Sequence, residues 1–358
     1  MSGIDIFGDD SSVECNGTEL QVTQSEAIES TTDADGYFVG RSGEAVGGYT
    51  IVCRIGQGTF GSVYEVDKKG ERYAMKIVRN NESMVKACQR EAEVVKEVEK
   101  EGREYVVMLL SEFKYKEHYC LVTELMEKSL RVLMNTRHCD YTVCELQKLT
   151  TDVLKALDML HRVCSVVHCD IKPDNILIVN NTAKLGDFGS AVRLHEREQS
   201  DEIGSRFYRA PEVMVGNKFD TKYDMWSVGV MLYEVVIGCV PFSGDSNNDM
   251  LYHIITIRGR IPQKMVRDGV YANIHFVDEN TFLHNEIDPF GKCVNRRVKN
   301  GCDGKKLFPT LTLRDFTQLI DKLLIVDPLK RASAQTALGF DFCTKTYEPT
   351  LALSQFKK

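Results

Sequence analysis

Alternation of apolar and polar positions predicts a group of β-strands near the start of the chain. Tyr73, Met75 and Ile77 recur at every second position, which gives one strand face an apolar character. Further strands are predicted at residues 51–55, 63–66, 105–110 and 118–123. Between residues 77 and 105, apolar residues recur at helical spacing and predict a helix up to residue 100. They are Val85, Cys88, Ala92 and Val95.

Helical periodicity dominates the rest of the chain. Residues 142–162 carry an apolar stripe made of Val143, Leu146, Leu149, Val153, Leu157 and Leu160. Residues 225–242 are nearly all apolar but include Glu234, which favours a buried core helix over a membrane span. Helices are also predicted at residues 313–326 and from Ser333 onward, whereas residues 243–312 look long and loop-rich. The predicted fold class is therefore α+β, with a small β-rich part followed by a larger helical part.

Composition and charge predict a boundary near residue 48 and argue against direct nucleic-acid binding. The 358 residues are 43% hydrophobic and 27% charged, as in water-soluble globular proteins. Residues 1–48 carry a net charge of −9 and few large apolar groups, so we expect a disordered acidic tail there. The remainder is close to neutral at +2, which gives no reason to expect direct nucleic-acid binding.

The cysteines and the first residues indicate the compartment. The twelve cysteines form no CxxC pair and no Cys/His cluster at zinc spacing, so we interpret them as reduced thiols. Met1 is followed by an acidic stretch and not by a secretory signal. We therefore expect an intracellular protein that is neither secreted nor membrane-bound.

One stretch, residues 167–212, concentrates polar residues suited to phosphoryl transfer. Asp170 can accept the proton of a substrate hydroxyl, and Lys172, two residues later, can stabilise charge on the moving phosphoryl group. The amide oxygen of Asn175 and the carboxylate of Asp187 are hard oxygen ligands of the kind that Mg²⁺ prefers. Each residue alone is more simply explained as a solvated loop residue, but their spacing, with Phe188-Gly189 and Ala210-Pro211-Glu212, matches the protein-kinase signature.

A glycine-rich stretch upstream is suited to phosphate groups. It consists of Gly56, Gln57, Gly58, Thr59, Phe60, Gly61, Ser62 and Val63. A lone GxGxxG is weak evidence, but this one joins two predicted strands, whereas a dinucleotide-binding loop opens a helix. Lys76 follows on the next predicted strand as a phosphate ligand, and Glu91 is our candidate to pair with it.

Taken together, these motifs resemble the eukaryotic protein kinases over residues 49–345. The resemblance implies a two-lobed fold, with an N-lobe at 49–124, a C-lobe at 125–345 that contains an insert at about 243–312, and a C-terminal tail at 346–358. It implies ATP in the cleft with Mg²⁺, adenine bound by backbone groups near Glu124 and Met126, and Thr123 controlling the depth of the pocket. Ile55, Ala74 and Leu177 complete the expected ATP-binding set. Structural roles are implied for Asp224, which would hold the catalytic loop, and for Arg331, which would pair with Glu212.

Finer motifs point to a subgroup. Residues 205–212, SRFYRAPE, and the long insert resemble the group of cyclin-dependent, MAP, glycogen-synthase and CDC-like kinases. Within that group the chain resembles the pre-mRNA-splicing kinase family of the tri-snRNP, at HCD (168–170), DFGSA (187–191), SNN (246–248), IRGRIP (257–262) and HF (275–276). This implies a Ser/Thr kinase acting on protein substrates, including spliceosomal proteins, in the nucleus or the cytoplasm.

Two alternatives and two local questions stay open. The chain could be a pseudokinase scaffold, although Lys76, Asp170, Asn175 and Asp187 are all present and predict activity, or a CDC-like or dual-specificity kinase with other substrates. His161 and His168 could be acid–base residues, but structural roles are the simpler expectation. Cys169 stands where many kinases have a phosphate-binding Arg, and Glu202 stands where related kinases have a phosphorylated Tyr. We hypothesise that Glu202 supplies a permanent charge that orders the activation loop through Arg206 or Arg209. The alternative is that Glu202 is an exposed loop carboxylate beside Asp201.

Overall fold

The computed structural model describes residues 32–137, 141–198, 200–287, 292–301, 307–308 and 311–357. These residues form two compact units. The sheet unit lies within Met1–Gln89 and Leu109–Leu125, and the helical unit lies within Arg90–Met108 and Met126–Lys358. The fold is thus α+β, as predicted from the sequence.

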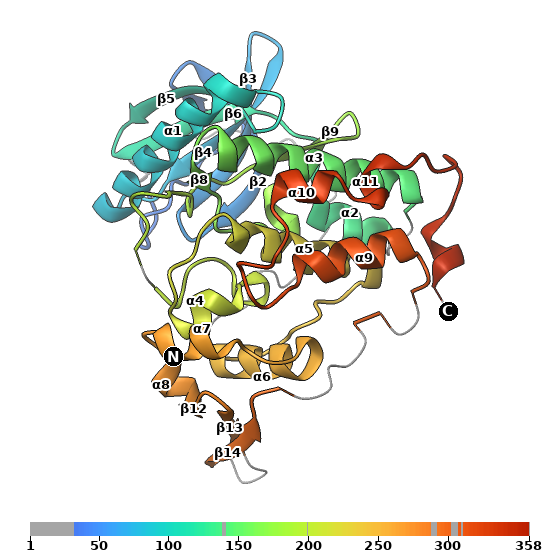
Figure 1. The fold of residues 1–358 in the computed structure, drawn as a ribbon. Coiled ribbons are helices and arrows are strands. Elements are labelled where there is room, and N and C mark those ends of the chain that lie inside the picture. The colour runs from blue at the N-terminus through green and yellow to red at the C-terminus, as the bar shows by residue number, and fades with distance from the viewer. Residues whose placement is uncertain are drawn as a thin grey trace. The chain divides into compact units, whose positions relative to one another are not determined.

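The sheet unit is one antiparallel sheet with the strand order β1-β2-β3-β4-β6-β5 (Figure 1). Its strands are β1 (Ala45–Val46), β2 (Tyr49–Gly58), β3 (Gly61–Lys68), β4 (Glu71–Val78), β5 (Leu109–Tyr115) and β6 (His118–Glu124). Four of the five predicted strands are confirmed. The strand predicted at 105–110 is wrong, because β5 begins at Leu109 and its alternating half-buried pattern continues to Tyr115.

Residues 32–48 belong to this sheet unit, so the prediction of a disordered tail up to residue 48 is wrong for that part. The Phe38 side chain is 1% exposed and packs edge-on against Tyr64 and His118, at ring-centroid distances of 6.1 and 5.4 Å. Val46 on β1 is fully buried in the same core. We call residues 32–40 the N-terminal strap; residues 1–31 lie outside the described part of the chain.

The helical unit is built around α5 (Lys222–Ile237), where the apolar run at 225–242 predicted a core helix. Trp226 is fully buried and stacks on Phe242. Alongside lie α9 (Arg314–Leu323), which packs on α5, and α10 (Ala334–Leu338), which packs on α3 (Val143–Arg162) (Figure 1). The predictions of a helix at 142–162 and of helices near 313–326 and after Ser333 are confirmed.

Local signals explain where these helices begin and end. Thr142 and Glu145 form a capping box at the start of α3, in which the Thr142 hydroxyl accepts from Glu145 N at 3.1 Å and the Glu145 carboxylate accepts from Thr142 N at 2.9 Å. Helix α5 ends at Gly238, whose φ of 90° lies in the left-handed region that favours glycine. The remaining helices outside the insert are α1 (Glu82–Gly102), α2 (Leu130–Arg137), α4 (Pro211–Val215), α11 (Asp341–Thr344) and the 3-10 turn η3 (Leu353–Phe356).

Short strands fix the loops that carry the chemistry. β9 (Ile176–Val179) pairs with β10 (Thr182–Leu185) and β7 (Lys128–Ser129), and β8 (Val166–Val167) pairs with β11 (Val192–Arg193). The 3-10 turn η1 (Pro173–Asn175) leads directly into β9, and a second 3-10 turn, η2 (Arg206–Tyr208), precedes α4. Residues 168–175 therefore lie between β8 and β9, and residues 186–191 lie between β10 and β11, all within the helical unit.

The insert is more ordered than its sequence suggested. The prediction of a loop-rich segment at 243–312 is wrong, because it contains α6 (Asn247–Arg258), α7 (Gln263–Asp268), α8 (Ala272–His275), β12 (Phe276–Asp278), β13 (Thr281–Ile287) and β14 (Cys293–Lys299). The three strands form a small antiparallel sheet beside α6 and α8 (Figure 1). These elements are short and rich in polar residues, so they lack the long apolar periodicity that would have revealed them.

The end of the chain packs onto the helical unit, where Leu353 is fully buried and its N–H donates to Tyr141 O at 2.9 Å. Among the residues that the structure describes, no helix combines the length and the apolar character needed to cross a membrane.

Candidate active site

The Asp170 carboxylate lies at the centre of a hydrogen-bond network within the helical unit. Its Oδ1 accepts from the Ser205 hydroxyl at 2.7 Å and from Ser205 N at 3.1 Å. Its Oδ2 accepts from Asn175 Nδ2 at 3.0 Å and pairs with Lys172 Nζ at 2.9 Å. The Lys172 ammonium also donates to Ser205 Oγ at 2.9 Å. Three of these residues were predicted site residues, and the structure brings them together around one carboxylate.

This network keeps Asp170 ionised. Burial alone would raise the pKa of the Asp170 carboxyl, but the Lys172 ammonium, the Ser205 hydroxyl and nearby His168 outweigh burial and hold that pKa below its ordinary value. Asp170 is therefore a carboxylate at neutral pH. It can orient a hydroxyl and accept its proton late in a phosphoryl transfer, when the proton has become acidic.

Asp224 holds the backbone of the catalytic loop, as the resemblance implied. Its carboxylate accepts from His168 N at 2.9 Å, from Cys169 N at 2.9 Å and from His161 Nε2 at 2.8 Å. Cys169 has a φ of 65°, so these two backbone bonds stabilise a conformation that non-glycine residues rarely adopt. His161 is thus part of a structural network and not an acid–base residue in the site.

His168 is also structural. Its Nδ1 accepts from Asp170 N at 3.3 Å, which requires Nε2 to carry the ring proton, and Nε2 donates to Gly186 O at 3.0 Å. Its ring lies 4.9 Å from that of Phe188, which is 2% exposed. The histidine therefore connects the loop of Asp170 to the loop of Asp187.

Asn175 and Asp187 fit a metal ion by the chemistry of their oxygens. The Asn175 amide nitrogen donates to both the carbonyl and the carboxylate of Asp170, at 2.9 and 3.0 Å, which leaves its Oδ1 as the free ligand atom. The Gly186 N–H donates to Asn175 O at 2.9 Å, so the residue before Asp187 is tied to Asn175. Asp187 is exposed and has a φ of 55°, and its described hydrogen bond is a weak one of 3.4 Å from Gly189 N. Two hard oxygens at this place are suited to Mg²⁺.

In the sheet unit, the glycine-rich stretch forms the predicted strand–turn–strand. Gly58 on β2 pairs with Gly61 on β3 across the Thr59-Phe60 turn. A side chain at Gly61 would lie 2.2 Å from Ile77 O, so only glycine fits there, whereas a side chain at Gly58 would meet no atom within 4 Å. Gly58 thus leaves the turn backbone open to a ligand.

Cross-strand register places several predicted ATP-binding residues on one face of the sheet. Val63 is paired with Lys76 and Ala74 is paired with Thr123, and paired residues point to the same side. Ser62 points to the other side and is 1% exposed, so only its backbone is available to a phosphate. The remaining predicted residues of this unit are Ile55, Gly56 and Gln57 on β2 and Glu124 at the end of β6.

The other predicted ATP-binding residues belong to the helical unit. Leu177 is on β9, and Met126 precedes β7. Glu91 on α1 lies beside the turn after Asp187, since a methyl group built on Gly189 would be 3.8 Å from its carboxylate oxygen. The pairing of Glu91 with Lys76 stays a prediction.

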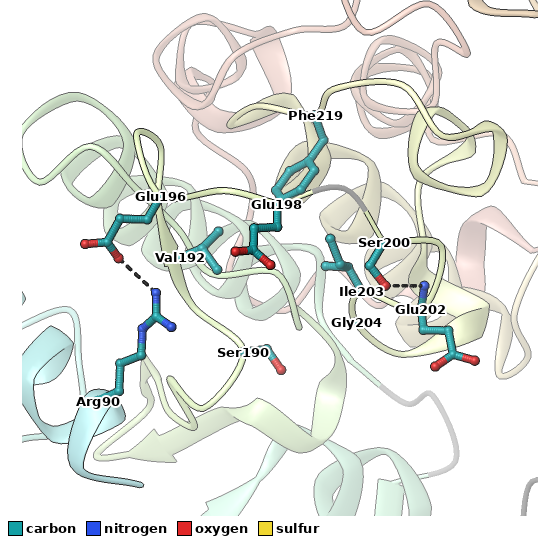
Figure 2. A pocket seen from close by; sticks show the side chains of 10 residues that line it. All are labelled: Arg90, Ser190, Val192, Glu196, Glu198, Ser200, Glu202, Ile203, Gly204 and Phe219. Carbon is teal, nitrogen blue, oxygen red and sulfur yellow. Dashed lines mark hydrogen bonds and ion pairs between the residues drawn. The ribbon is translucent and has the colours of Figure 1, made fainter. Parts of the chain in front are cut away.

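The activation loop contains Glu202, the residue of our hypothesis about a permanent charge. The Glu202 side chain is exposed and makes no described hydrogen bond or ion pair with Arg206 or Arg209. Figure 2 shows Glu202 and Arg90 on opposite sides of an open cavity of about 340 Å³, in which Arg90 is paired with Glu196 at 3.0 Å. No direct contact of Glu202 with Arg206 or Arg209 is thus described, but the Glu202 carboxylate opposes the lowering of the Arg209 pKa by burial, so the hypothesis of a permanent ordering charge stays a prediction.

The end of the activation segment is anchored as the resemblance implied. Arg331 donates to both oxygens of Glu212, at 2.7 and 2.8 Å, and the two side chains are 0% and 1% exposed. This buried bidentate pair fixes α4 against the segment that follows α9.

Two contributions to the site could not be predicted from the sequence. Ser205 lies within the SRFYRAPE motif, which does not indicate that it contacts both Asp170 and Lys172. A second cluster joins Arg131 to Glu234 at 2.6 Å and to the Tyr208 hydroxyl at 2.8 Å, and Tyr208 donates to Glu234. Burial first, and then the Glu234 carboxylate, raise the pKa of Tyr208, which stays neutral. No sequence pattern joins residues so far apart in the chain.

The fold and these sites together define a protein kinase. The chain belongs to the protein kinase domain family, whose match covers residues 49–343. It is similar to serine/threonine-protein kinase prpf4B of Dictyostelium discoideum, with 33% identity over 342 residues, which cover 87% of this chain and 41% of the relative.

The chain is also similar to two further kinases. Serine/threonine-protein kinase prp4 of Schizosaccharomyces pombe is 31% identical over 336 residues, covering 87% of this chain and 70% of the relative. Dual specificity tyrosine-phosphorylation-regulated kinase 3 of Mus musculus is 28% identical over 347 residues, covering 90% and 58%. The chain thus spans between 41% and 70% of the lengths of these relatives. The predicted kinase family and the predicted similarity to this branch of serine/threonine kinases are confirmed.

Proposed function

We propose that this chain transfers the γ-phosphoryl group of ATP to Ser or Thr side chains of proteins. The observation that carries this proposal is the Asp170 carboxylate, which is held by Ser205, Lys172 and Asn175 at 2.7–3.0 Å and stays ionised. A carboxylate fixed in this way can orient a substrate hydroxyl for attack.

Each surrounding residue has a separate task. Lys172 is proposed to stabilise negative charge on the transferred phosphoryl group while it keeps the pKa of Asp170 low. Asn175 Oδ1 and the Asp187 carboxylate are proposed to hold Mg²⁺, which, when bound, would neutralise charge on the phosphates. Asp224 keeps the loop backbone in place and does not itself contact the reacting groups.

ATP recognition is proposed for residues of both units. In the sheet unit, backbone groups of residues 56–62 would contact the phosphates, as would Lys76. Ile55, Val63, Ala74 and Thr123 would line the adenine site, and backbone groups of Glu124 would bind adenine. In the helical unit, Met126 would bind adenine through its backbone, Leu177 would pack against it, and Glu91 would pair with Lys76. The shared face of Val63, Lys76, Ala74 and Thr123 supports the sheet-unit part.

The proposed substrates are splicing-associated proteins, and the proposed compartment is the nucleus. Two observations support this finer assignment: the motif resemblance to the tri-snRNP splicing kinases, and the similarity to relatives named prpf4B and prp4. The residues of the site itself support only the transfer to a hydroxyl.

A peptide assay with matched acceptors tests the proposed reaction. Three peptides that differ only in a central Ser, Thr or Tyr are incubated with the full chain, ATP and Mg²⁺, and phosphate incorporation is measured by mass. We expect transfer to Ser and Thr and none to Tyr. Asp187→Asn should lower the rate by roughly 10²–10³, and calorimetry should show that it also removes the Mg²⁺ dependence of ATP binding. Transfer to the Tyr peptide alone, or an Asp187→Asn rate within a few-fold of wild type, would overturn the proposal.

A further inference from the structure

Residues 203 and 204 of the activation loop are bound by a buried cation, Arg209. Its guanidinium donates to Ile203 O at 2.9 Å and to Gly204 O at 2.8 Å. Arg209 is only 7% exposed, and burial lowers its pKa from its ordinary value. A guanidinium removed from water needs its donors satisfied, so a change in any acceptor should shift its position.

The third acceptor of Arg209 comes from the insert. Asn247, the first residue of α6, accepts from Arg209 at 2.7 Å through its Oδ1. The amide nitrogen of the same side chain donates to Asp201 O at 2.9 Å. Asn247 therefore contacts the loop twice, once through Arg209 and once directly at its backbone.

The start of α6 is joined to neighbouring elements of the insert by hydrogen bonds of Asn248. Asn248 is 3% exposed, and its amide nitrogen donates to Leu283 O at 2.9 Å and to His275 Nδ1 at 3.2 Å. Its Oδ1 accepts from Asn285 N at 2.8 Å. Burial lowers the pKa of His275 to about 4, so its ring is neutral and can accept this bond. These bonds join α6 to α8 and β13, so Asn247 projects from a rigid part of the insert.

The loop segment that Asn247 and Arg209 hold leads directly to the catalytic carboxylate. Ser205 follows Gly204, and its N–H and hydroxyl both donate to Asp170 Oδ1. The same segment is bound from α5, where the Tyr223 hydroxyl donates to Ile203 O at 2.9 Å. Displacement of residues 203 and 204 would therefore move the hydroxyl that orients Asp170.

We propose that Asn247 is a positioning residue for phosphoryl transfer, acting through Arg209 and residues 203–204 on Ser205 and thereby on Asp170. The proposal rests on the proposed function for its kinetic consequence. In this proposal Asn247, the first residue of α6, orders the activation loop. Cys169 offers no cation for that task, and no direct contact of Glu202 with Arg206 or Arg209 is described. The insert then becomes part of the machinery that aligns the substrate hydroxyl.

Three variants of neighbouring residues test it in the full chain. Asn247→Ala removes both contacts and should lower kcat/KM for a Ser peptide roughly 2- to 30-fold, with the KM for ATP unchanged. Asn247→Asp keeps an acceptor for Arg209 but loses the donor to Asp201 O and Oδ2, so it should be slower than wild type and clearly faster than Asn247→Ala. Ser246→Ala is the matched control, because it removes the N-cap bond of α6 to Asp249 N without touching Arg209. It should lower Tm by a few degrees and leave kcat/KM unchanged.

The outcomes separate a positioning role from a structural one. Equal losses of kcat/KM in Asn247→Ala and Ser246→Ala, or no loss in Asn247→Ala, would overturn the proposal, as would an Asn247→Asp protein as slow as Asn247→Ala. Amide hydrogen exchange of residues 203–205, measured by mass, gives a readout that needs no activity. It should quicken in Asn247→Ala but not in Ser246→Ala. Failure of the proposed function would instead leave the wild type without peptide phosphorylation while this exchange difference remains.

Discussion

Ser205 donates twice to Oδ1 of Asp170, from its hydroxyl at 2.7 Å and from its backbone N–H at 3.1 Å. Ser205→Ala removes one of these bonds, and a hydrogen bond to a charged group contributes about 1.5–3 kcal/mol. We therefore expect kcat for peptide phosphorylation to fall by roughly tenfold or more. Ser205→Thr retains the hydroxyl and should recover most of the rate, as steady-state kinetics would show.

The same variant should change the pH dependence of the reaction. The Lys172, Ser205 and His168 side chains lower the pKa of Asp170 against the opposing effect of burial, so loss of the Ser205 hydroxyl raises that pKa. The carboxylate is the active form, so activity disappears as pH falls through this pKa. The acid limb of the kcat profile should therefore move to higher pH in Ser205→Ala. A limb that stays in place would show that Ser205 does not act on Asp170.

The buried pair of Glu212 and Arg331 should dominate the local stability of the helical unit. Arg331→Met leaves the Glu212 carboxylate buried without its cation, which typically costs about 3–5 kcal/mol in the free energy of unfolding. The double variant Arg331→Met/Glu212→Leu removes both charges and should recover a large part of that loss. Urea denaturation of the three proteins measures this, and a double variant less stable than the single one would contradict the account.

Phe38 in the N-terminal strap should contribute to the stability of the sheet unit as a core residue does. Phe38→Ala leaves a cavity next to Tyr64 and His118 and should destabilise the sheet unit by about 3–5 kcal/mol. Val39, which is 48% exposed, supplies the neighbouring control, and Val39→Ala should change the urea midpoint little. Equal midpoints for the two variants would mean that the strap does not pack on the sheet in solution.

Cysteine reactivity should follow burial and not position in the motifs. Burial, followed by the Asp224 and Asp170 carboxylates, raises the pKa of Cys169 well above its ordinary value, and burial raises that of Cys120 to about 12. Among the described residues, Cys53, Cys239 and Cys293 are exposed. Because the thiolate is the reactive form, iodoacetamide at pH 8 should label these three exposed cysteines long before Cys169 and Cys120. Peptide mass mapping over time tests this, and early labelling of Cys169 would contradict the structure of the catalytic loop.

The catalytic residues could be predicted because short contiguous motifs carry them. Asp170, Lys172 and Asn175 lie within six residues, so the local loop conformation alone brings them together. Gly56, Gly58 and Gly61 were identified by the same local logic, and the β2–β3 turn has the predicted form. Long apolar periodicity likewise predicted α3 and α5.

The sequence did not reveal features that depend on isolated residues or on distant partners. Phe38 lies in the three-residue run Tyr37-Phe38-Val39 within an acidic stretch, and so short a run shows neither helical nor strand periodicity, so its burial could not be predicted. Residues 105–110 are mostly apolar, whereas the strand that forms, β5, alternates between half-buried and exposed residues and begins only at Leu109. Arg209 has its acceptors at residues 203, 204 and 247, and no local pattern indicates such a set.

Single-turnover transfer by Asp170→Asn shows whether the Asp170 carboxylate carries the phosphoryl transfer. The substitution keeps the size of the side chain and removes the carboxylate that accepts the proton. The full chain and the variant are loaded with labelled ATP and Mg²⁺, and the label transferred to a Ser peptide is followed with time. The account predicts a rate lower by roughly 10²–10⁴, with ATP affinity within about threefold of wild type because Asp170 does not bind the nucleotide. Transfer by Asp170→Asn at a rate within a few-fold of wild type would contradict it.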